Sequence, residues 1–223
     1  LKRPRASGLP PRPRRAAAAM GGDGGEPVVA AGDYMQTLVE KNPWALYRGT
    51  EDIWGHRGAV LEAIRAVPEL LAEASPQLRA DPEVVSAAAA QDGEVLRYAS
   101  AEVQDNADVV LVAIRSSPRS LRFASPRLRG LRAVVLEAVR GNALTLQFAS
   151  EELRRDHELV DEAVKLNPHA LMHASKDLRA DKRVICPAIR SNPCVLQHAA
   201  DTLKGDTEVL VAAGLRAAPP DLF

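Results

Sequence analysis

The chain has 223 residues, of which 46% are hydrophobic but only 4% aromatic, and its formal net charge is zero. Its longest apolar runs, such as VVLVAI from Val109, have about six residues, whereas a membrane-spanning helix needs roughly 20, so the sequence predicts no transmembrane segment. Two cysteines are too few for a disulfide framework. Small apolar side chains with few aromatic ones favour closely packed helices.

The first segment, residues 1–27, is basic and rich in Pro, Ala and Gly. It holds six basic and two acidic side chains, which leaves 23 basic and 27 acidic side chains for residues 28–223. Such a composition does not fold by itself, and it resembles an organelle transit peptide or its retained end. We expect an extended tail that a partner surface in a larger assembly holds in place. Its candidate partner-binding residues are Arg3, Arg5, Arg12, Arg14 and Arg15.

Residues 28–223 form the second predicted region, which repeats with a period of 25 residues. Ala-Ser pairs recur at this step without insertion or deletion, from Ala74-Ser75 to Ala174-Ser175. Chance does not place several such ladders in one register, so we count seven units from about residue 31 and a truncated eighth. One of the leucine ladders is Leu71, Leu96, Leu121, Leu146, Leu171 and Leu196.

Within a unit, the pattern predicts two short helices and a single turn. Asp156 precedes apolar side chains with the spacing of a helical stripe, so it begins a helix of about ten residues. The dipeptide Asn167-Pro168 offers the N-cap and the first-turn proline of a second, shorter helix. Ser150 then caps a single turn whose leucine, three residues later, enters the core.

One unit cannot bury its apolar faces alone, but stacked units can bury them continuously. The predicted fold is therefore all-α, an α-solenoid of about seven 25-residue helix pairs that follows an extended N-terminal tail. Pro187 lies inside one of the longer helices, directly after Cys186, and predicts a bend or a local break there.

The consensus D-x-x-V-V-x-x-A-V-x-x-N-P/G-x-x-L-x-F/Y-A-S-x-x-L-R resembles the repeat of DUF4116, a domain of unknown function. EVVSAAAAQDGEVLRYASAEV from Glu83 and AVVLEAVRGNALTLQFASEEL from Ala133 carry the likeness best, and it covers roughly residues 56–213. The family occurs in arrays in protists, algae and large viruses. The resemblance implies a helical repeat without an established activity. This chain departs from the pattern at Arg48, Glu73 and Leu131.

No catalytic site is predicted. An active site uses one nucleophile with a neighbouring base, whereas Ser75, Ser100, Ser125, Ser150 and Ser175 recur with the repeat and have no recurrent base. The sequence shows neither a glycine-rich phosphate loop nor a nucleophile elbow. We therefore expect a protein that is not an enzyme and needs no cofactor.

Two rows of basic side chains follow the repeat, and stacking would align each of them along the solenoid. Either row can meet phosphates or an acidic partner, although a cation at a helix end also complements the helix dipole and one before an Asp cap can pair with it. The helix row, at the end of the longer helices, is our candidate for partner binding: Arg65, Arg115, Arg140, Lys165 and Arg190. The turn row lies just before the caps: Arg79, Arg129, Arg154, Arg179 and Lys204.

A His3Cys set is the sharpest local constellation. His169 and His173 are four residues apart, and Cys194 and His198 occupy the same two positions one unit later. Two adjacent helices could thus present a composition that suits zinc. The alternative is that His173 and His198 are half-buried substitutes for the aromatic residue of the other units.

These features lead to one leading hypothesis and one alternative. We expect a non-catalytic scaffold for protein–protein interaction, an accessory subunit of a large photosynthetic or respiratory complex in an organelle, with the plastid slightly favoured over the mitochondrion. The alternative is an organellar nucleic-acid-binding repeat protein, because the units are distantly similar to those of organellar transcription-termination factors. The units of those factors are longer, and they bind nucleic acid. The net negative charge of residues 28–223 favours the first.

Overall fold

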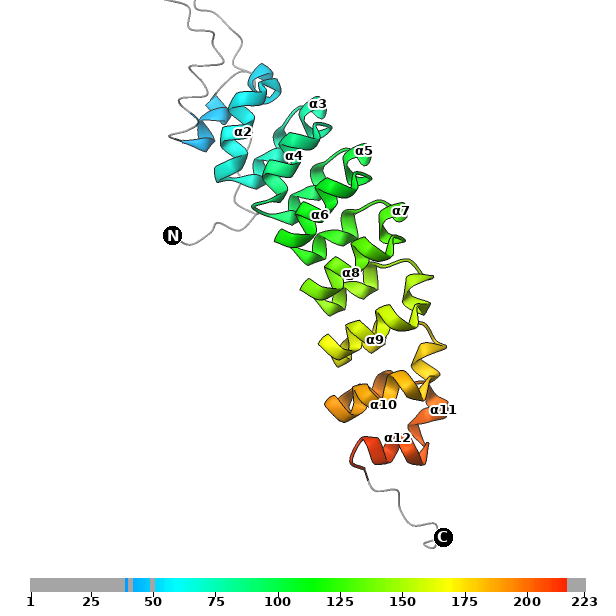
Figure 1. Ribbon diagram of the computed structural model, residues 1–223. Coiled ribbons are helices and arrows are strands. Elements are labelled where there is room, and N and C mark those ends of the chain that lie inside the picture. The colour runs from blue at the N-terminus through cyan, green and yellow to red at the C-terminus, as the bar shows by residue number, and fades with distance from the viewer. Residues whose placement is uncertain (1–38, 40–41, 49–50, 216–223) are drawn as a thin grey trace, which may run out of the picture.

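The computed structural model describes residues 39, 42–48 and 51–215. The tail with its arginines, and the predicted boundary at residue 28, lie outside these residues. Every regular element in the described part of the chain is a helix, and the units stack one after another into an elongated array (Figure 1). The all-α repeat fold is therefore confirmed. None of the described helices is long and apolar enough to cross a membrane.

One layer of the array consists of α-helices, each of which packs against the next along the chain. Their N-caps follow the prediction: the carboxylate of Asp156 accepts a hydrogen bond from the backbone N–H of Leu159, whereas Leu131 offers no side-chain cap to its helix. The bounds of these helices are α2 Arg57–Ala66, α4 Pro82–Ala89, α6 Ala107–Ser116, α8 Arg132–Gly141, α9 His157–Leu166, α10 Lys182–Ser191 and α12 Thr207–Ala212.

The second layer consists of 3-10 helices, which the sequence pattern predicted only as shorter helices. A 3-10 helix rises about 2.0 Å per residue against 1.5 Å in an α-helix, so six residues span nearly the length of the preceding α-helix. Because fewer residues are needed for the return path, the chain can come back to the start of the next α-helix within a 25-residue unit. Their bounds are η2 Pro43–Arg48, η4 Pro68–Glu73, η5 Gly93–Tyr98, η6 Pro118–Phe123, η7 Ala143–Phe148, η9 Pro168–His173 and η11 Pro193–His198.

A single turn of helix links each unit to the next, and these turns form one edge of the array (Figure 1). Ser150 caps its turn as predicted, since its Oγ accepts from the backbone N–H of Leu153. Its own N–H donates to the carbonyl oxygen of Arg129 in the preceding turn, at 2.9 Å. The turns are α3 Pro76–Arg79, α5 Ala101–Gln104, α7 Pro126–Arg129, η8 Leu153–Arg155, η10 Leu178–Ala180 and α11 Asp201–Lys204, and η3 Glu51–Gly55 precedes α2.

Of the two outcomes predicted at Pro187, a bend or a local break, the local break is wrong. Helix α10 runs through this residue as one ten-residue element. A proline inside a helix removes one backbone hydrogen bond. Ile185, Ala188 and Ile189 around it are buried, and α10 packs between α9 and α12, so the burial of this apolar face holds the helix together.

Candidate binding surface along the turns

The helix row, our candidate from the sequence, is engaged in ion pairs. Arg115 and Arg140 donate to carboxylates that lie 22 residues later, on the next α-helix, at 3.1 and 2.9 Å. Among the described residues Arg190 is the member of the row without an ion pair. Exposed pairs of this kind stabilise the fold by only about 0–1 kcal/mol, but they give each basic side chain an acidic partner within the protein. The four pairs are Arg65–Glu62, Arg115–Glu137, Arg140–Glu162 and Lys165–Asp161.

The turn row behaves differently, because four of its arginines have no acidic partner in the part of the chain that the structure describes. Each of the four is half-buried, and its Nε atom is buried without a hydrogen-bond partner. The lysine that ends the row, Lys204, pairs with Asp201 at 2.6 Å. The four arginines are Arg79, Arg129, Arg154 and Arg179.

The interpretation that these arginines pair with the helix caps is wrong. Two cap carboxylates take their cations from the first residue of the preceding α-helix: Arg132 donates to Asp156 at 3.0 Å, and Lys182 lies 2.7 Å from Asp206. The cap Asp181 pairs with Arg183 of its own helix at 2.8 Å. The hydrogen bond from Lys182 lowers the pKa of Asp206. The caps are thus already neutralised, which leaves the arginines of the turn row unpaired.

Half-buried rings alternate with the turn row along the array. Arg154 lies beside His173, whose pKa is lowered first by burial and then by the charge of this guanidinium. The pKa of His198 is likewise lowered, first by burial and then by the charges of His169 and Arg179. Both imidazoles are therefore held toward the neutral form. The rings at this position are Tyr98, Phe123, Phe148, His173 and His198.

Two of these rings are already covered by arginines of the 3-10 helices. The guanidinium of Arg97 lies 4.6 Å from the ring centroid of Tyr98, and that of Arg122 lies 4.5 Å from the centroid of Phe123. A cation over an aromatic face is attracted to it by the ring quadrupole. One face of each of these two rings is therefore already covered and not open for stacking.

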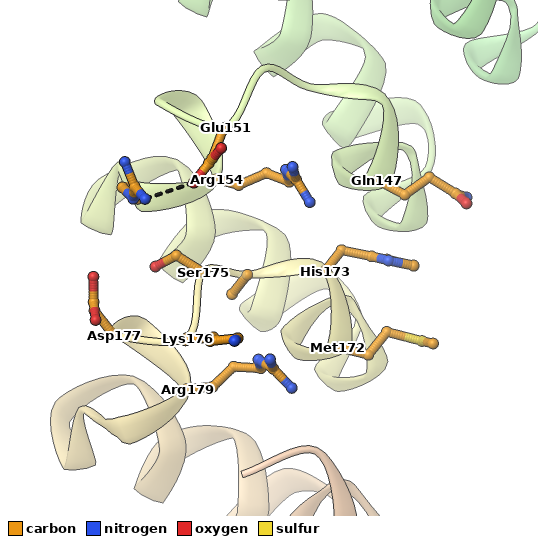
Figure 2. A pocket seen from close by; sticks show the side chains of 11 residues that line it. Gln147, Glu151, Arg154, Met172, His173, Ser175, Lys176, Asp177 and Arg179 are labelled. Atoms are coloured by element: carbon orange, nitrogen blue, oxygen red, sulfur yellow. Dashed lines mark hydrogen bonds and ion pairs between the residues drawn. The ribbon is translucent and has the colours of Figure 1, made fainter. Parts of the chain in front are cut away.

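A pocket of about 510 Å³ lies where the turn row and the rings meet in the C-terminal half. Figure 2 shows that the side chains of Arg154 and Arg179 point the same way as His173, from above and below it. Lys176 also lines the pocket. The acidic lining residues are Glu151, which pairs with Arg155 at 2.5 Å, and Asp177. The pocket is therefore basic on balance.

The His3Cys hypothesis is not supported by the geometry. The rings of His169 and His198 are in edge contact with centroids 6.0 Å apart, but the Nε2 atom of His169 lies 3.2 Å from the side-chain amide of Asn192. His173 lines the pocket and Cys194 is exposed. Within the described ranges, no three His, Cys, Asp or Glu side chains gather into a group that could hold a metal ion. The alternative interpretation of His173 and His198, as half-buried rings, is confirmed.

The charge spacing in the sequence does not by itself separate the two rows. An acidic residue stands 22 positions after Arg115 and after Arg140, which places it on the neighbouring helix within reach of each. The same step joins Arg129 to Glu151 in the turn row, yet Glu151 pairs with Arg155 instead. Asp201 likewise lies 22 positions after Arg179 but pairs with Lys204. The packing between units, rather than the spacing in the sequence, therefore decides which arginines remain unpaired.

The comparisons with known proteins agree with the repeat. Three stretches, residues 56–104, 81–129 and 132–179, match the model of a family described as a domain of unknown function (DUF4116). Each match spans about two of the 25-residue units, and the first two overlap by one unit. No curated protein and no solved structure matches the chain.

Proposed function

The chain belongs to the DUF4116 family, and from this premise we propose that it is a non-catalytic scaffold that binds other proteins along the turn row. The observation that carries the proposal is the contrast between the two rows. Most of the helix row is engaged in ion pairs, whereas Arg79, Arg129, Arg154 and Arg179 are unpaired in the described part of the chain. A half-buried cation without a partner has lost part of its hydration and has gained no opposite charge in return. An acidic ligand would supply both the hydrogen bonds and the opposite charge.

Nucleic acid is the second candidate, since alternating cations and rings can also track a phosphate backbone. Two observations favour protein. One face of Tyr98 and one face of Phe123 are covered by Arg97 and Arg122, so a base cannot stack on those faces without displacing the arginines. The free carboxylate of Asp177 also lines the pocket, where it would repel a continuous chain of phosphates.

Site-specific photo-crosslinking tests the proposal. Gln147 is exposed and lines the pocket, so a photo-reactive amino acid at this position would report what lies on the turn row (Figure 2). In an extract of the source cells we expect a nuclease-resistant protein adduct. Unlabelled chain should compete for it, and a chain with Arg154→Gln and Arg179→Gln should not.

The matched control carries the photo-reactive group at Arg190, on the helix row, where the same adduct should be absent. An adduct that nuclease removes would replace the scaffold proposal with the nucleic-acid one. An equally strong adduct from both positions would mean that the turn row has no special part in binding.

We further propose that the partner is a subunit of an organellar complex, with the plastid slightly favoured. Support comes only from the composition of residues 1–27 and from the distribution of the family. A fluorescent fusion of the chain should localise to plastids, and the same fusion without residues 1–27 should not. Cytosolic fluorescence from both fusions would exclude the proposal.

A further inference from the structure

We propose that the turn row binds a protein segment in an extended conformation that presents a carboxylate at every third residue, in register with the repeat. This inference rests on the proposed function, because it specifies the chemistry of the partner at the same surface. It also specifies one position of the segment that carries no charge. Three features of the row lead to it: its step, the environment of its arginines and its one gap.

The step of the row matches an extended peptide. Packed helices lie about 8–10 Å apart, so successive turns of the array are separated by about that distance. A polyproline II segment rises about 3.1 Å per residue and has three residues per turn, so residues three apart lie about 9 Å apart on one side. A β-strand also rises about 10 Å over three residues, but its side chains alternate between two faces, so the polyproline II form is the one that fits. One unit of the scaffold therefore corresponds to three residues of the ligand.

The environment of the arginines favours carboxylates. A guanidinium offers donors in a fixed fork that matches a carboxylate in a bidentate pair. The buried Nε atoms restrict the side chains, so a ligand meets guanidinium groups that are already partly ordered. In the pocket of Figure 2, Arg154 and Arg179 stand on successive turns with Lys176 beside them. This pocket is the place where two neighbouring carboxylates of the ligand would bind.

The gap in the row lies at Gln104, which occupies the position of the arginines on turn α5. Its side-chain amide donates to the carbonyl oxygen of Leu96 at 3.0 Å, so it is satisfied within the fold and neutral. Counting three residues per unit from Arg79 to Arg179 gives a ligand of about 13 residues. Its carboxylates stand at positions 1, 7, 10 and 13, and position 4 faces Gln104. In the opposite chain direction the positions are 1, 4, 7 and 13.

The acidic residues of the pocket fit this spacing. Glu151 pairs with Arg155. Asp177 is exposed, and its carboxylate lies on the other side of the pocket from the guanidinium groups of Arg154 and Arg179 (Figure 2). A peptide with two neutral residues between carboxylates can place the neutral residues opposite Asp177. A polynucleotide has a phosphate at every nucleotide and lacks this freedom.

Fluorescence anisotropy with labelled 13-residue peptides tests the inference. Three isomers contain four Glu among the same neutral residues: one has Glu at positions 1, 7, 10 and 13, one at 1, 4, 7 and 13, and one at four consecutive positions. We expect one of the first two to bind best, and the clustered isomer to bind at least about five-fold more weakly, the loss expected for one charge pair.

The substitutions that test the turn row exchange Arg and Gln, two residues that the chain itself has at these positions of the turns. Arg154→Gln and Arg179→Gln place at these sites the residue that the fold accepts at position 104, and each should weaken binding about five-fold. Arg140→Gln removes the same charge from the helix row and should leave binding unchanged. Gln104→Arg fills the gap, so it should strengthen binding, by about five-fold, of a peptide with Glu added at the position facing residue 104.

The outcomes separate this inference from the proposed function. Equal binding of all three isomers, or no binding of any, overturns the register, while a competed protein adduct at Gln147 would still support the scaffold. A single-stranded RNA of 12 nucleotides that binds more tightly than every peptide, and loses affinity in Arg154→Gln, would overturn both. Unchanged peptide binding in Arg154→Gln and Arg179→Gln would show that the ligand lies elsewhere.

Discussion

The availability of an arginine to a partner depends on what its guanidinium already contacts. Arg140 and Arg154 have the same charge and lie in the same unit, on α8 and on the turn η8. Arg140 donates to Glu162 at 2.9 Å, whereas Arg154 contacts no carboxylate in the described residues and has a buried, unpaired Nε atom. Sequence position alone therefore does not indicate which arginine can bind a ligand.

The same surface contains two histidines whose protonation the fold resists. Burial lowers the pKa of both His173 and His198. In the unfolded chain each imidazole titrates near its ordinary value of about 6.5. Between the lowered and the ordinary value the unfolded state binds more protons, so the free energy of unfolding falls as the pH falls through this window.

We therefore predict that His173→Phe with His198→Phe flattens the dependence of stability on pH. The wild type should lose stability as the pH falls through and below about 6.5, the ordinary pKa of histidine, and the double variant should lose less, because phenylalanine does not titrate. Denaturant unfolding followed by circular dichroism at several pH values measures this. Carboxylates with a lowered pKa, such as that of Asp206, act in a separate window, since the stability that they contribute is lost only as the pH falls below about 4. Equal slopes in both proteins would contradict the prediction.

The 3-10 helices pack so closely against the α-helices that one of them has no room for a side chain. Gly93 begins η5, and a Cβ atom added to it would lie 2.0 Å from the carbonyl oxygen of Ala113 on α6. Ala143 occupies the equivalent position of η7 and is accommodated there in a buried site. The spacing between layers thus differs from unit to unit, although the sequence period does not.

We expect Gly93→Ala to lower the free energy of unfolding by about 1–3 kcal/mol, because the obstructing atom is backbone and the helices must shift. Gly205→Ala is the control: no atom lies within 4 Å of its added Cβ, so its stability should change by less than about 0.5 kcal/mol. Denaturant titration measures both variants. Equal free energies of unfolding for Gly93→Ala and Gly205→Ala would indicate that η5 and α6 can move apart without loss of stability.

The elements show which features the sequence could predict. The serine caps and the start of α9 at Asp156 follow from local patterns, because each depends on residues within one turn of helix. The period follows from the recurrence of the same residues at every 25th position. The 3-10 form of the second helix, the continuity of α10 through Pro187 and the ion pairs of the helix row depend on packing between units. For the same reason the sequence could not show that Asn192, rather than a metal, meets His169.

At the scale of the whole molecule, the array is held together by links between neighbouring units. Hydrogen bonds such as that from the N–H of Ser150 to the carbonyl of Arg129 connect consecutive turns, and ion pairs such as Arg57–Asp81 connect consecutive α-helices. Stability in such an array is close to a sum of unit and interface terms. The length of the turn row, and hence its register with a ligand, is then set by the number of units.

We predict that deleting residues 80–104 shortens the array by one unit and leaves it folded. The deletion joins Arg79 to Asp105 in the same register, and Arg57, which now pairs with Asp81 and Glu83, meets Asp108 at the position of Glu83. Circular dichroism should show the same helical signal per residue, and the denaturant dependence of unfolding should decrease with the smaller buried surface. Deleting residues 80–103 instead shifts every later side chain by one position and should abolish cooperative unfolding.

The shortened array also has no gap, because Gln104 is removed and Arg79 becomes the immediate neighbour of Arg129 on the turn row. A ligand that follows the register must then present carboxylates at positions 1, 4, 7 and 10. We expect a peptide with this pattern to bind the shortened chain about five-fold more tightly than the isomer that suits the full chain, with the reverse preference in the full chain. If both chains prefer the same isomer, removal of one unit has not changed the carboxylate spacing that the peptide needs. The ligand then does not follow the repeat.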